Sequence, residues 1–362
     1  MDYQNAFRNP ELVKQLVQRI HKEVERNYTF MEVCGGHTMA IHHFGIPGLL
    51  PDCIRLLSGP GCPVCVSSAH FVDSAIAYAR MEQTMIASYG DLIKVPGSAG
   101  SLEEVRAEGA LVEVVYSASD AVKLASNNPD FNVVFLGIGF ETTAPVNALA
   151  IKHAAEAALP NFFMLSAQKI MPPALRSVAS GGSQLDGFIC PGHVSAITGS
   201  NMYSFLVEEF GLACVISGFE PVDILYTILK LVLQVNQKKP LVEIQYKRAV
   251  KPEGNEKAKA LMDEVYELKD DYWRGFGVIP KSGLQLSSMY ASMDATKQMP
   301  LPVKEMKVVD RGCICGEILK GLKLPKDCAL FGGACHPGHP VGPCMVSSEG
   351  VCQAHFKYHA YV

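Results

Sequence analysis

The chain has 362 residues, 48% of them hydrophobic and 19% charged, which is the composition of an ordinary globular protein with a large core. The formal net charge of −4 gives no reason to expect nucleic acid or an anionic membrane as a partner. Residues 1–30 lack the apolar stretch of a signal peptide, and the apolar segment 224–235 is too short to span a bilayer, so we expect a cytoplasmic protein.

Short apolar runs alternate with amphipathic stretches from residue 27 to residue 238, a pattern that predicts an α/β fold with parallel sheets. We predict strands near residues 28–33, 53–57, 84–88, 111–116, 132–138, 161–165, 187–190 and 212–216. These strands form two sets of four, and the last units of the two sets look alike. They are "VVYSASDAVKLA" at 114–125 and "VISGFEPVDILYTI" at 215–228. The sequence therefore predicts an internal duplication, with a first α/β domain over 27–128 and a second over 129–238.

The pattern changes after residue 238. Residues 251–273 read as a turn followed by a charged amphipathic helix, and residues 274–286 are interrupted by glycine and proline. A cysteine-rich tail follows. We place a third domain at 239–362, either alone or together with residues 1–26, whose predicted helix 9–26 would pack on it.

Small, polar, glycine- or proline-rich turns follow the predicted strands in both halves. They include "CGGHT" and "SGPGCPVC" in the first half, and "GFETT", "CPGHVS" and "SGFEP" in the second. Glycine and proline also end strands that have no function. Ligands of open parallel sheets, however, bind at the carboxyl ends of the strands. Turns that together carry Cys, His, Glu and Thr favour a site in a crevice between the two domains.

Three cysteines lie on the first two turns: Cys34 in "VCGGHT", and Cys62 and Cys65 in "CPVC". The alternative for Cys34 is a core cysteine beside a tight turn. The C-x-x-C unit has three interpretations: half of a zinc site, a redox pair, or a metal-handling dithiol. A helix that begins there would lower the pKa of its thiols. If the first two strands are neighbours, these thiols and His37 share one crevice, a donor set that suits a transiently carried transition metal.

Six of the twelve cysteines fall in the last fifty residues, namely Cys313, Cys315, Cys328, Cys335, Cys344 and Cys352. Cysteines of a reducing compartment are more often metal ligands or catalytic thiols than structural disulfides. The spacing lacks the two C-x-x-C units of a zinc ribbon, whereas four thiolates hold an iron–sulfur cluster. We predict a cluster bound by four of the six, with zinc as the alternative, and the other two as a redox disulfide beside it.

Taken together, "CGGHT", "GPGCPVC", "GFETT", "PGHVS" and the tail motif "CMVSSEGVC" resemble the HypD family of [NiFe]-hydrogenase maturation proteins, across nearly the whole chain. The resemblance implies two similar α/β domains plus a cluster domain, and a scaffold on which an Fe(CN)2CO unit is assembled. It implies a HypC-type small chaperone and a HypE-type cyanide donor as partners. On the matching residues, Cys34 would hold the iron with His37 beside it, Cys62 and Cys65 would be a thiol/disulfide pair, and the tail would bind a [4Fe-4S] cluster.

The expected function is therefore that of a metallocluster-assembly scaffold with redox activity. The cluster would pass electrons through cysteine pairs to a transient Fe(II) that carries cyanide and CO. Further residues expected to line the crevice are Gly35, Gly36, Thr38, Glu141, Thr142, His193 and Glu220. The alternative for the last four is capping of strands and helices. A rival function is an iron–sulfur-dependent protein disulfide reductase, which needs neither Cys34 nor His37, and a third is a zinc-stabilised scaffold.

Overall fold

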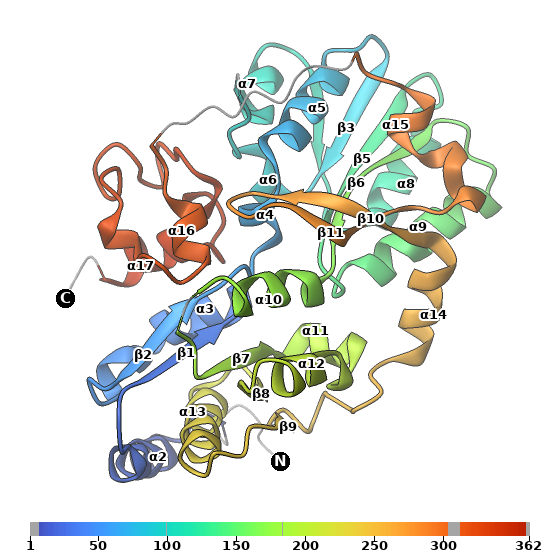
Figure 1. The fold of residues 1–362 in the computed structure, drawn as a ribbon. Coiled ribbons are helices and arrows are strands. Elements are labelled where there is room, and N and C mark those ends of the chain that lie inside the picture. Colours follow the sequence, from blue (N-terminus) through green and yellow to red (C-terminus); the bar gives the residue numbers. More distant parts are fainter. Residues whose placement is uncertain (1–6, 99, 183, 303–311, 360–362) are drawn as a thin grey trace.

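The structure is a computed structural model that describes residues 7–98, 100–182, 184–302 and 312–359. It contains two β-sheets with helices packed against them, and a small cysteine-rich unit formed by residues 312–359 lies beside both (Figure 1). The α/β fold class predicted from the sequence is confirmed. No helix in these ranges is both long enough and apolar enough to cross a membrane.

The first sheet has five parallel strands in the order β2-β1-β7-β8-β9. They are β1 (Tyr28–Glu32), β2 (Ile54–Ser58), β7 (Gly187–Pro191), β8 (Ala213–Ser217) and β9 (Val242–Ile244). The helices connected to it are α2 (Pro10–Glu23), α3 (Gly35–His43), η1 (Ile46–Leu49), α4 (Pro63–Val66), α11 (Gly192–Thr198), η2 (Asn201–Tyr203), α12 (Ser204–Glu208) and α13 (Pro221–Asn236).

The second sheet has the order β10-β11-β6-β5-β3-β4, with an antiparallel hairpin added to four parallel strands. The strands are β3 (Thr84–Ser88), β4 (Leu111–Val114), β5 (Asn132–Gly139), β6 (Phe162–Lys169), β10 (Tyr266–Trp273) and β11 (Gly277–Leu286). Its helices are α5 (Ala69–Ala79), α6 (Gly90–Ile93), α7 (Leu102–Ala107), α8 (Ala118–Asn127), α9 (Ala144–Glu156), α10 (Met171–Ala179), α14 (Glu256–Val265), η3 (Ser288–Met293) and α15 (Ala295–Gln298).

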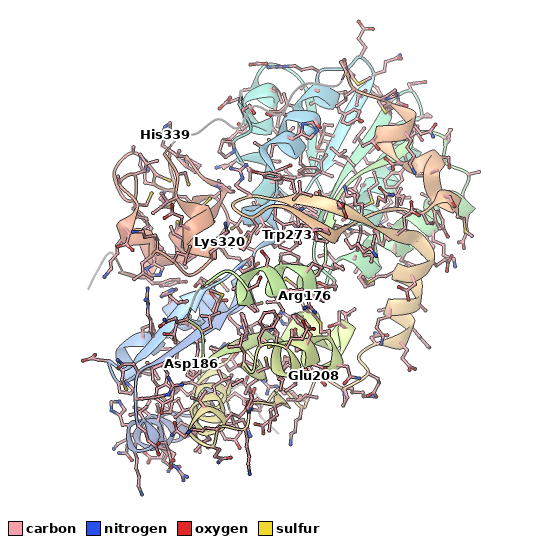
Figure 2. The ribbon with its side chains drawn as sticks, viewed as in Figure 1. Arg176, Asp186, Glu208, Trp273, Lys320 and His339 are labelled. Atoms are coloured by element: carbon pink, nitrogen blue, oxygen red, sulfur yellow. The ribbon has the colours of Figure 1, made fainter. Side chains whose placement is uncertain are left out.

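The cysteine-rich unit contains only short helices in its described residues. These are α16 (Cys315–Leu319), η4 (Pro325–Asp327), η5 (Pro343–Met345) and α17 (Val351–His359). One buried apolar cluster runs from the facing sides of the two sheets into this unit, and includes Phe140, Phe188, Trp273 and Met345. Figure 2 shows Trp273, on the hairpin, and Lys320, in the cysteine-rich unit, on the two sides of this junction.

All eight predicted strands are present, but they do not divide into two contiguous halves. The predicted boundary at 128/129 falls between β4 and β5, which belong to the same sheet. The chain leaves the first sheet after β2, builds the second sheet, and returns at β7, which pairs with β1. Local patterns specify a parallel strand but not its partner, because the pairing is made between residues far apart in the sequence. The domains predicted at 27–128 and 129–238 are therefore corrected.

Two predictions about the third domain are also corrected. The predicted helix 251–273 ends at Val265 and continues as β10, and the interrupted segment after it forms β11. The N-terminal helix α2 packs against α13 of the first sheet and not on the cysteine-rich unit. Its apolar side includes the fully buried Ile20, and the Asn236 side chain donates a hydrogen bond to the Glu23 carbonyl at 2.7 Å.

Candidate functional site

The carboxyl ends of four adjacent strands in the first sheet carry most of the predicted site residues. Because β2, β1, β7 and β8 are neighbours in that order, the turns that follow them lie side by side. In the same order these turns carry Cys62 and Cys65, then Cys34 and His37, then His193, and then Glu220. The sheet thus brings together residues that the sequence had assigned to two separate domains.

The turn after β1 touches the turn after β2 directly. The Gly35 N–H donates to the Gly61 carbonyl at 3.0 Å. A Cβ atom on Gly61 would lie 2.2 Å from the Cys34 nitrogen, and one on Gly36 would lie 3.2 Å from the Phe219 ring. Real side chains do not tolerate the first of these contacts, so glycine is required at residue 61 for the two turns to meet.

Cys34 is the residue immediately before α3, and part of its surface is exposed. Burial of the thiol by its surroundings raises its pKa to about 12, although the backbone N–H groups of His37 and Gly36 favour the thiolate. Its own N–H donates to a carboxylate oxygen of Glu32 at 2.9 Å, and the Thr38 hydroxyl donates to the other oxygen. Glu32 therefore holds the Cys34 turn in place.

His37 is fully buried behind this turn. Its Nε2 donates to the Gly218 carbonyl at 3.0 Å, and burial lowers its pKa to about 4, so the ring is neutral at pH 7. Its Nδ1 has no hydrogen-bond partner among the described residues. The ring stacks on Phe219 with centroids 4.4 Å apart, and His193 stacks on the same ring at 4.0 Å. Two imidazoles from neighbouring turns thus share one aromatic ring.

Cys62 and Cys65 form a buried pair of thiols at α4. Their sulfur atoms are 2.7 Å apart, and their exposed fractions are 4% and 0%. The predicted lowering of the pKa is wrong for Cys65, because burial raises the pKa of its thiol well above the usual value. The helix is a single turn over Pro63–Val66, and its dipole does not outweigh desolvation.

All six cysteines of the tail line one pocket, together with apolar side chains such as Ile318, Phe331 and Met345. One of the six, Cys344, contacts Cys65 of the dithiol and also Cys315 of the tail. Cys315 in turn contacts Cys313. The thiols therefore form a continuous line from the dithiol at α4 into the cysteine pocket.

The donor set of this pocket fits an iron–sulfur cluster. Such a cluster takes four thiolates in an apolar surrounding, and six thiols are present here between apolar walls. In the part of the chain that the structure describes, no three His, Cys, Asp or Glu side chains are arranged to hold a single metal ion.

The tip of the β10–β11 hairpin joins the dithiol helix to the cysteine-rich unit. The Arg274 N–H donates to the Val66 carbonyl at 2.8 Å, and its Nε donates to the Ser67 carbonyl at 3.0 Å. A Cβ atom on Gly275 would lie 2.3 Å from the Cα of Gly316, so backbone packs on backbone there. The positive charge of Arg274 also favours the thiolates of two tail cysteines, Cys313 and Cys315.

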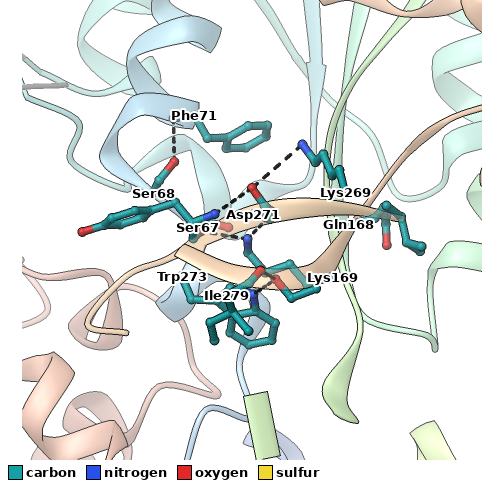
Figure 3. A network of polar contacts seen from close by, with 12 residues as sticks. Ser67, Ser68, Phe71, Gln168, Lys169, Lys269, Asp271, Trp273 and Ile279 are labelled. Atoms are coloured by element: carbon teal, nitrogen blue, oxygen red, sulfur yellow. Dashed lines mark hydrogen bonds and ion pairs between the residues drawn. The ribbon is translucent and has the colours of Figure 1, made fainter. Parts of the chain in front are cut away.

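A polar network anchors this hairpin on the second sheet (Figure 3). The buried Lys169 ammonium pairs with Asp271 and donates to the Tyr272 carbonyl at 3.0 Å. The fully buried Trp273 donates from Nε1 to the Ser282 hydroxyl at 2.8 Å and stacks on Phe140. The second sheet thus supports the element that holds the dithiol helix against the tail.

The remaining predicted residues have structural contacts of their own. Glu141, after β5 of the second sheet, accepts from the Met171 N–H at 2.9 Å, while its Oε2 has no partner among the described residues. Burial raises its pKa to about 7. Thr142 is half-buried on the same turn. Glu220 caps α13 and pairs with Arg8, as the capping alternative predicts.

Sequence reasoning missed three residues that the structure places around the thiols. Glu32 interrupts the apolar run "YTFMEV", and this acid in a buried strand was the available signal. A Cβ atom on Gly35 would lie 2.4 Å from the Cβ of Glu349, so the tail packs directly on the Cys34 turn. Burial raises the pKa of Glu349. Arg274 gave no signal, because its role depends on where the hairpin lies.

The chain matches a known protein family and several of its members over nearly its whole length. A family model described as HypD, "Hydrogenase formation hypA family", matches residues 11–359. The chain is 45% identical to hydrogenase maturation factor HypD2 of Bradyrhizobium diazoefficiens, over 99% of this chain and 97% of that protein. It is 44% identical to hydrogenase maturation factor HypD of Azotobacter vinelandii over the same shares.

A protein of another organism is similar as well. The chain is 43% identical to a putative hydrogenase expression/formation protein of Methanocaldococcus jannaschii, over 96% of this chain and 97% of that protein. The family model and these relatives cover the first sheet, the second sheet and the cysteine-rich unit alike. The chain therefore belongs to the HypD family of hydrogenase maturation factors.

Proposed function

We propose that this maturation factor holds an iron ion on Cys34 while cyanide and CO are attached, as part of assembling the Fe(CN)2CO unit of a [NiFe]-hydrogenase. The observation that carries the proposal is the position of Cys34. The residue is partly exposed and lies where the β1 and β2 turns meet, beside the dithiol of α4 and the neutral ring of His37.

The surroundings of Cys34 suit a metal-dependent thiolate. With a pKa of about 12, the thiol stays protonated at pH 7 unless a cation replaces the proton. Fe(II), the substrate ion, supplies that charge, and strong-field ligands such as cyanide and CO favour its low-spin form. The backbone N–H groups of Gly36 and His37 favour the same thiolate. The Nδ1 of His37, which has no hydrogen-bond partner among the described residues, is an acceptor close to this turn.

We assign the tail cysteines from their contacts. Cys315 and Cys344 lie in the line of thiols that begins at Cys65, so we propose them as the redox pair. The four that would hold a [4Fe-4S] cluster are then Cys313, Cys328, Cys335 and Cys352. When bound, the cluster supplies one-electron reduction next to these thiols.

The contacts support a thiol–disulfide exchange along this line. The Cys344 thiolate attacks Cys65 of a Cys62–Cys65 disulfide, forms a Cys65–Cys344 bond and releases Cys62 as a thiolate. Cys315 then attacks Cys344 and releases Cys65. The disulfide has moved to Cys315–Cys344, and two electrons have passed to the pair beside Cys34. A HypC-type chaperone and a HypE-type cyanide donor remain part of this proposal as partners.

The rival function, a disulfide reductase acting on other proteins, is less well supported. Its active thiols must reach a disulfide in a second protein, but Cys62 is 4% exposed and Cys65 is fully buried. Of the three cysteines on these two turns, the partly exposed one is Cys34, which a reductase does not need. The internal exchange described above requires no such access.

Infrared spectroscopy of the anaerobically purified full chain tests the proposal. The expected result is stretching bands of iron-bound cyanide and CO in the wild type and in Cys53→Ser, a control at a partly exposed cysteine elsewhere on the first sheet. The bands should be lost in Cys34→Ser. Bands that persist in Cys34→Ser overturn the assignment of the iron to this residue, and bands absent from every form favour the reductase.

A further inference from the structure

A second cavity lies between the outer edge of the first sheet and the cysteine-rich unit. Its volume is about 160 Å³, comparable to the cavity of about 150 Å³ that binds benzene in an engineered protein. Its walls are mostly apolar, with Ile41 and Ile54 on one side and Ile318 and Val351 on the other. It shares only Ile318 with the pocket of the six cysteines. The cavity has room for one small organic molecule.

The free edge of β2 supplies hydrogen-bonding groups to this cavity. The Tyr28 N–H donates to the Cys53 carbonyl, and the Gly59 N–H donates to the Glu32 carbonyl. Bonding to a given neighbour alternates along a parallel strand, so the N–H and C=O groups of Leu56 and Ser58 face outward. Both residues line the cavity, and among the described residues no hydrogen bond engages these groups. Unpaired main-chain donors in a partly enclosed space favour an acceptor.

The charged side chains of the lining favour an anion. Arg55 and Lys323 both border the cavity, and neither has an ion-pair partner among the residues that the structure describes. His42 and His355 close another side of it, with ring centroids 4.4 Å apart. The one carboxylate of the lining, Glu32, already accepts hydrogen bonds from Cys34 and Thr38.

We propose that this cavity binds a small organic carboxylate with a compact apolar body. Arg55, Lys323 and the free N–H groups of the β2 edge would bind the carboxylate, and the isoleucine walls would enclose the apolar part. Such a ligand would contact Glu32, which holds the Cys34 turn, and Ile318, which also lines the cysteine pocket. The site thus lies between the two chemical centres of the molecule without belonging to either.

Methyl NMR of the full chain, labelled at the isoleucine δ1 methyl groups, tests the proposal with 4-methylpentanoate as the probe. Ile41 and Ile54 should shift in a saturable way, with half-saturation at or below about 10 mM for a ligand of this size. Ile151, buried in the core of the second sheet, and Ile279, on its hairpin, do not line the cavity, so they should not shift and also report that the chain is folded. Because the methyl shifts report binding in the cavity directly, the outcome does not depend on the function proposed above.

A double variant and a matched control identify the groups that bind the carboxylate. Arg55→Ala with Lys323→Ala should weaken binding at least tenfold. Arg106→Ala with Lys123→Ala removes the same charge from α7 and α8 of the second sheet, at residues that do not line the cavity, and should leave binding unchanged. The proposal is overturned if neither Ile41 nor Ile54 shifts at about 50 mM probe, a concentration well above the expected half-saturation. It is also overturned if 4-methylpentylamine acts equally well, or if the double variant binds as the wild type does.

Discussion

The two sheets place very different residues at the carboxyl ends of their parallel strands. In the first sheet these turns carry Cys34, Cys62 and Cys65, and the cysteine-rich unit packs on them. In the second sheet the corresponding turn carries Glu141, whose carboxylate binds the Met171 N–H, and the hairpin β10–β11 lies beside it through the stacking of Trp273 on Phe140. In the function proposed above, similar architecture would support chemistry in one sheet and scaffolding in the other.

The second sheet contributes by supporting the β10–β11 hairpin. Lys169 and Asp271 anchor the hairpin, and the hairpin tip binds the carbonyl groups at the end of α4. We therefore expect substitutions at the thiol-bearing turns of the first sheet to abolish maturation. Substitutions in the second sheet should lower stability or disturb the alignment of the thiols.

The largest effect is expected from removing the dithiol. Cys62→Ser with Cys65→Ser should abolish maturation of the hydrogenase, because no disulfide can then be reduced beside Cys34. The visible absorption of the iron–sulfur cluster should remain, since the cysteines proposed to hold it are unchanged. Hydrogenase activity in cells that lack the native factor measures the first, and the absorption spectrum measures the second. Full activity in the double variant would contradict the exchange proposed here.

A large structural effect is expected at the contact between the two turns. In Gly61→Ala the new Cβ would lie 2.2 Å from the Cys34 nitrogen, so the turns must separate. We expect the free energy of unfolding to fall by about 2–4 kcal/mol and the Cys34 site to lose iron. Gly48→Ala, where a Cβ meets nothing within 4 Å, is the control and should change stability by less than about 0.5 kcal/mol. Equal urea midpoints for the two variants would refute the contact.

The raised pKa of Glu141 leads us to expect that stability depends on pH through this residue of the second sheet. Its pKa is raised from 4.5 to about 7 in the folded chain, so its contribution to stability is complete below pH 4.5. As the pH rises from 4.5 to 7, the unfolded chain releases the proton and the folded chain keeps it, so stability falls, by up to about 3 kcal/mol.

Glu141→Gln should remove this loss. Urea unfolding of the wild type and the variant between pH 5 and pH 8 should show curves that diverge as the pH rises, with the variant more stable at the alkaline end. The infrared bands of the iron should be unchanged in the variant. Parallel stability curves would show that the carboxyl group is not buried as the structure has it.

The smallest effect is expected at the hairpin tip. Arg274→Gln removes the hydrogen bond from Nε to the Ser67 carbonyl and the charge near Cys313, and should lower the free energy of unfolding by about 1–2 kcal/mol. Reduction of the Cys62–Cys65 pair should slow as the line of thiols loosens. Arg80→Gln, at an exposed ion pair, is the control for both readouts. Unchanged kinetics would limit Arg274 to a structural role.

Local patterns were sufficient to predict the strands and the turns of the site. The strands β1, β2, β7 and β8 are short, mainly apolar runs that end at proline or a polar residue, and the turns with Cys34, Cys62 and Cys65 follow β1 and β2. Sheet membership was not predictable in this way, since β1 pairs with β7 across a separation that no local signal records. That pairing is also why His193 lies near His37. The two residues belong to the same edge of one sheet and not to two separate domains.

The electrostatics of the thiols depended on burial that the sequence does not specify. A cysteine at a helix start predicts a lowered pKa, but Cys65 is covered by the tail, and desolvation dominates. Glu32 and Arg274 act through contacts that exist only after the turns, the hairpin and the tail have packed together. Residue types thus indicated which chemistry to expect, and the packing determined which residues support it.

In the function proposed here, the first sheet holds the iron being assembled at Cys34. Mössbauer spectroscopy of chains enriched in ⁵⁷Fe tests it most directly, because low-spin Fe(II) and cluster iron give separate signals. The account predicts a low-spin Fe(II) signal in the wild type and in Glu141→Gln, and its loss in Cys34→Ser with the cluster signal intact. A low-spin signal that survives in Cys34→Ser, or disappears in Glu141→Gln, would contradict it.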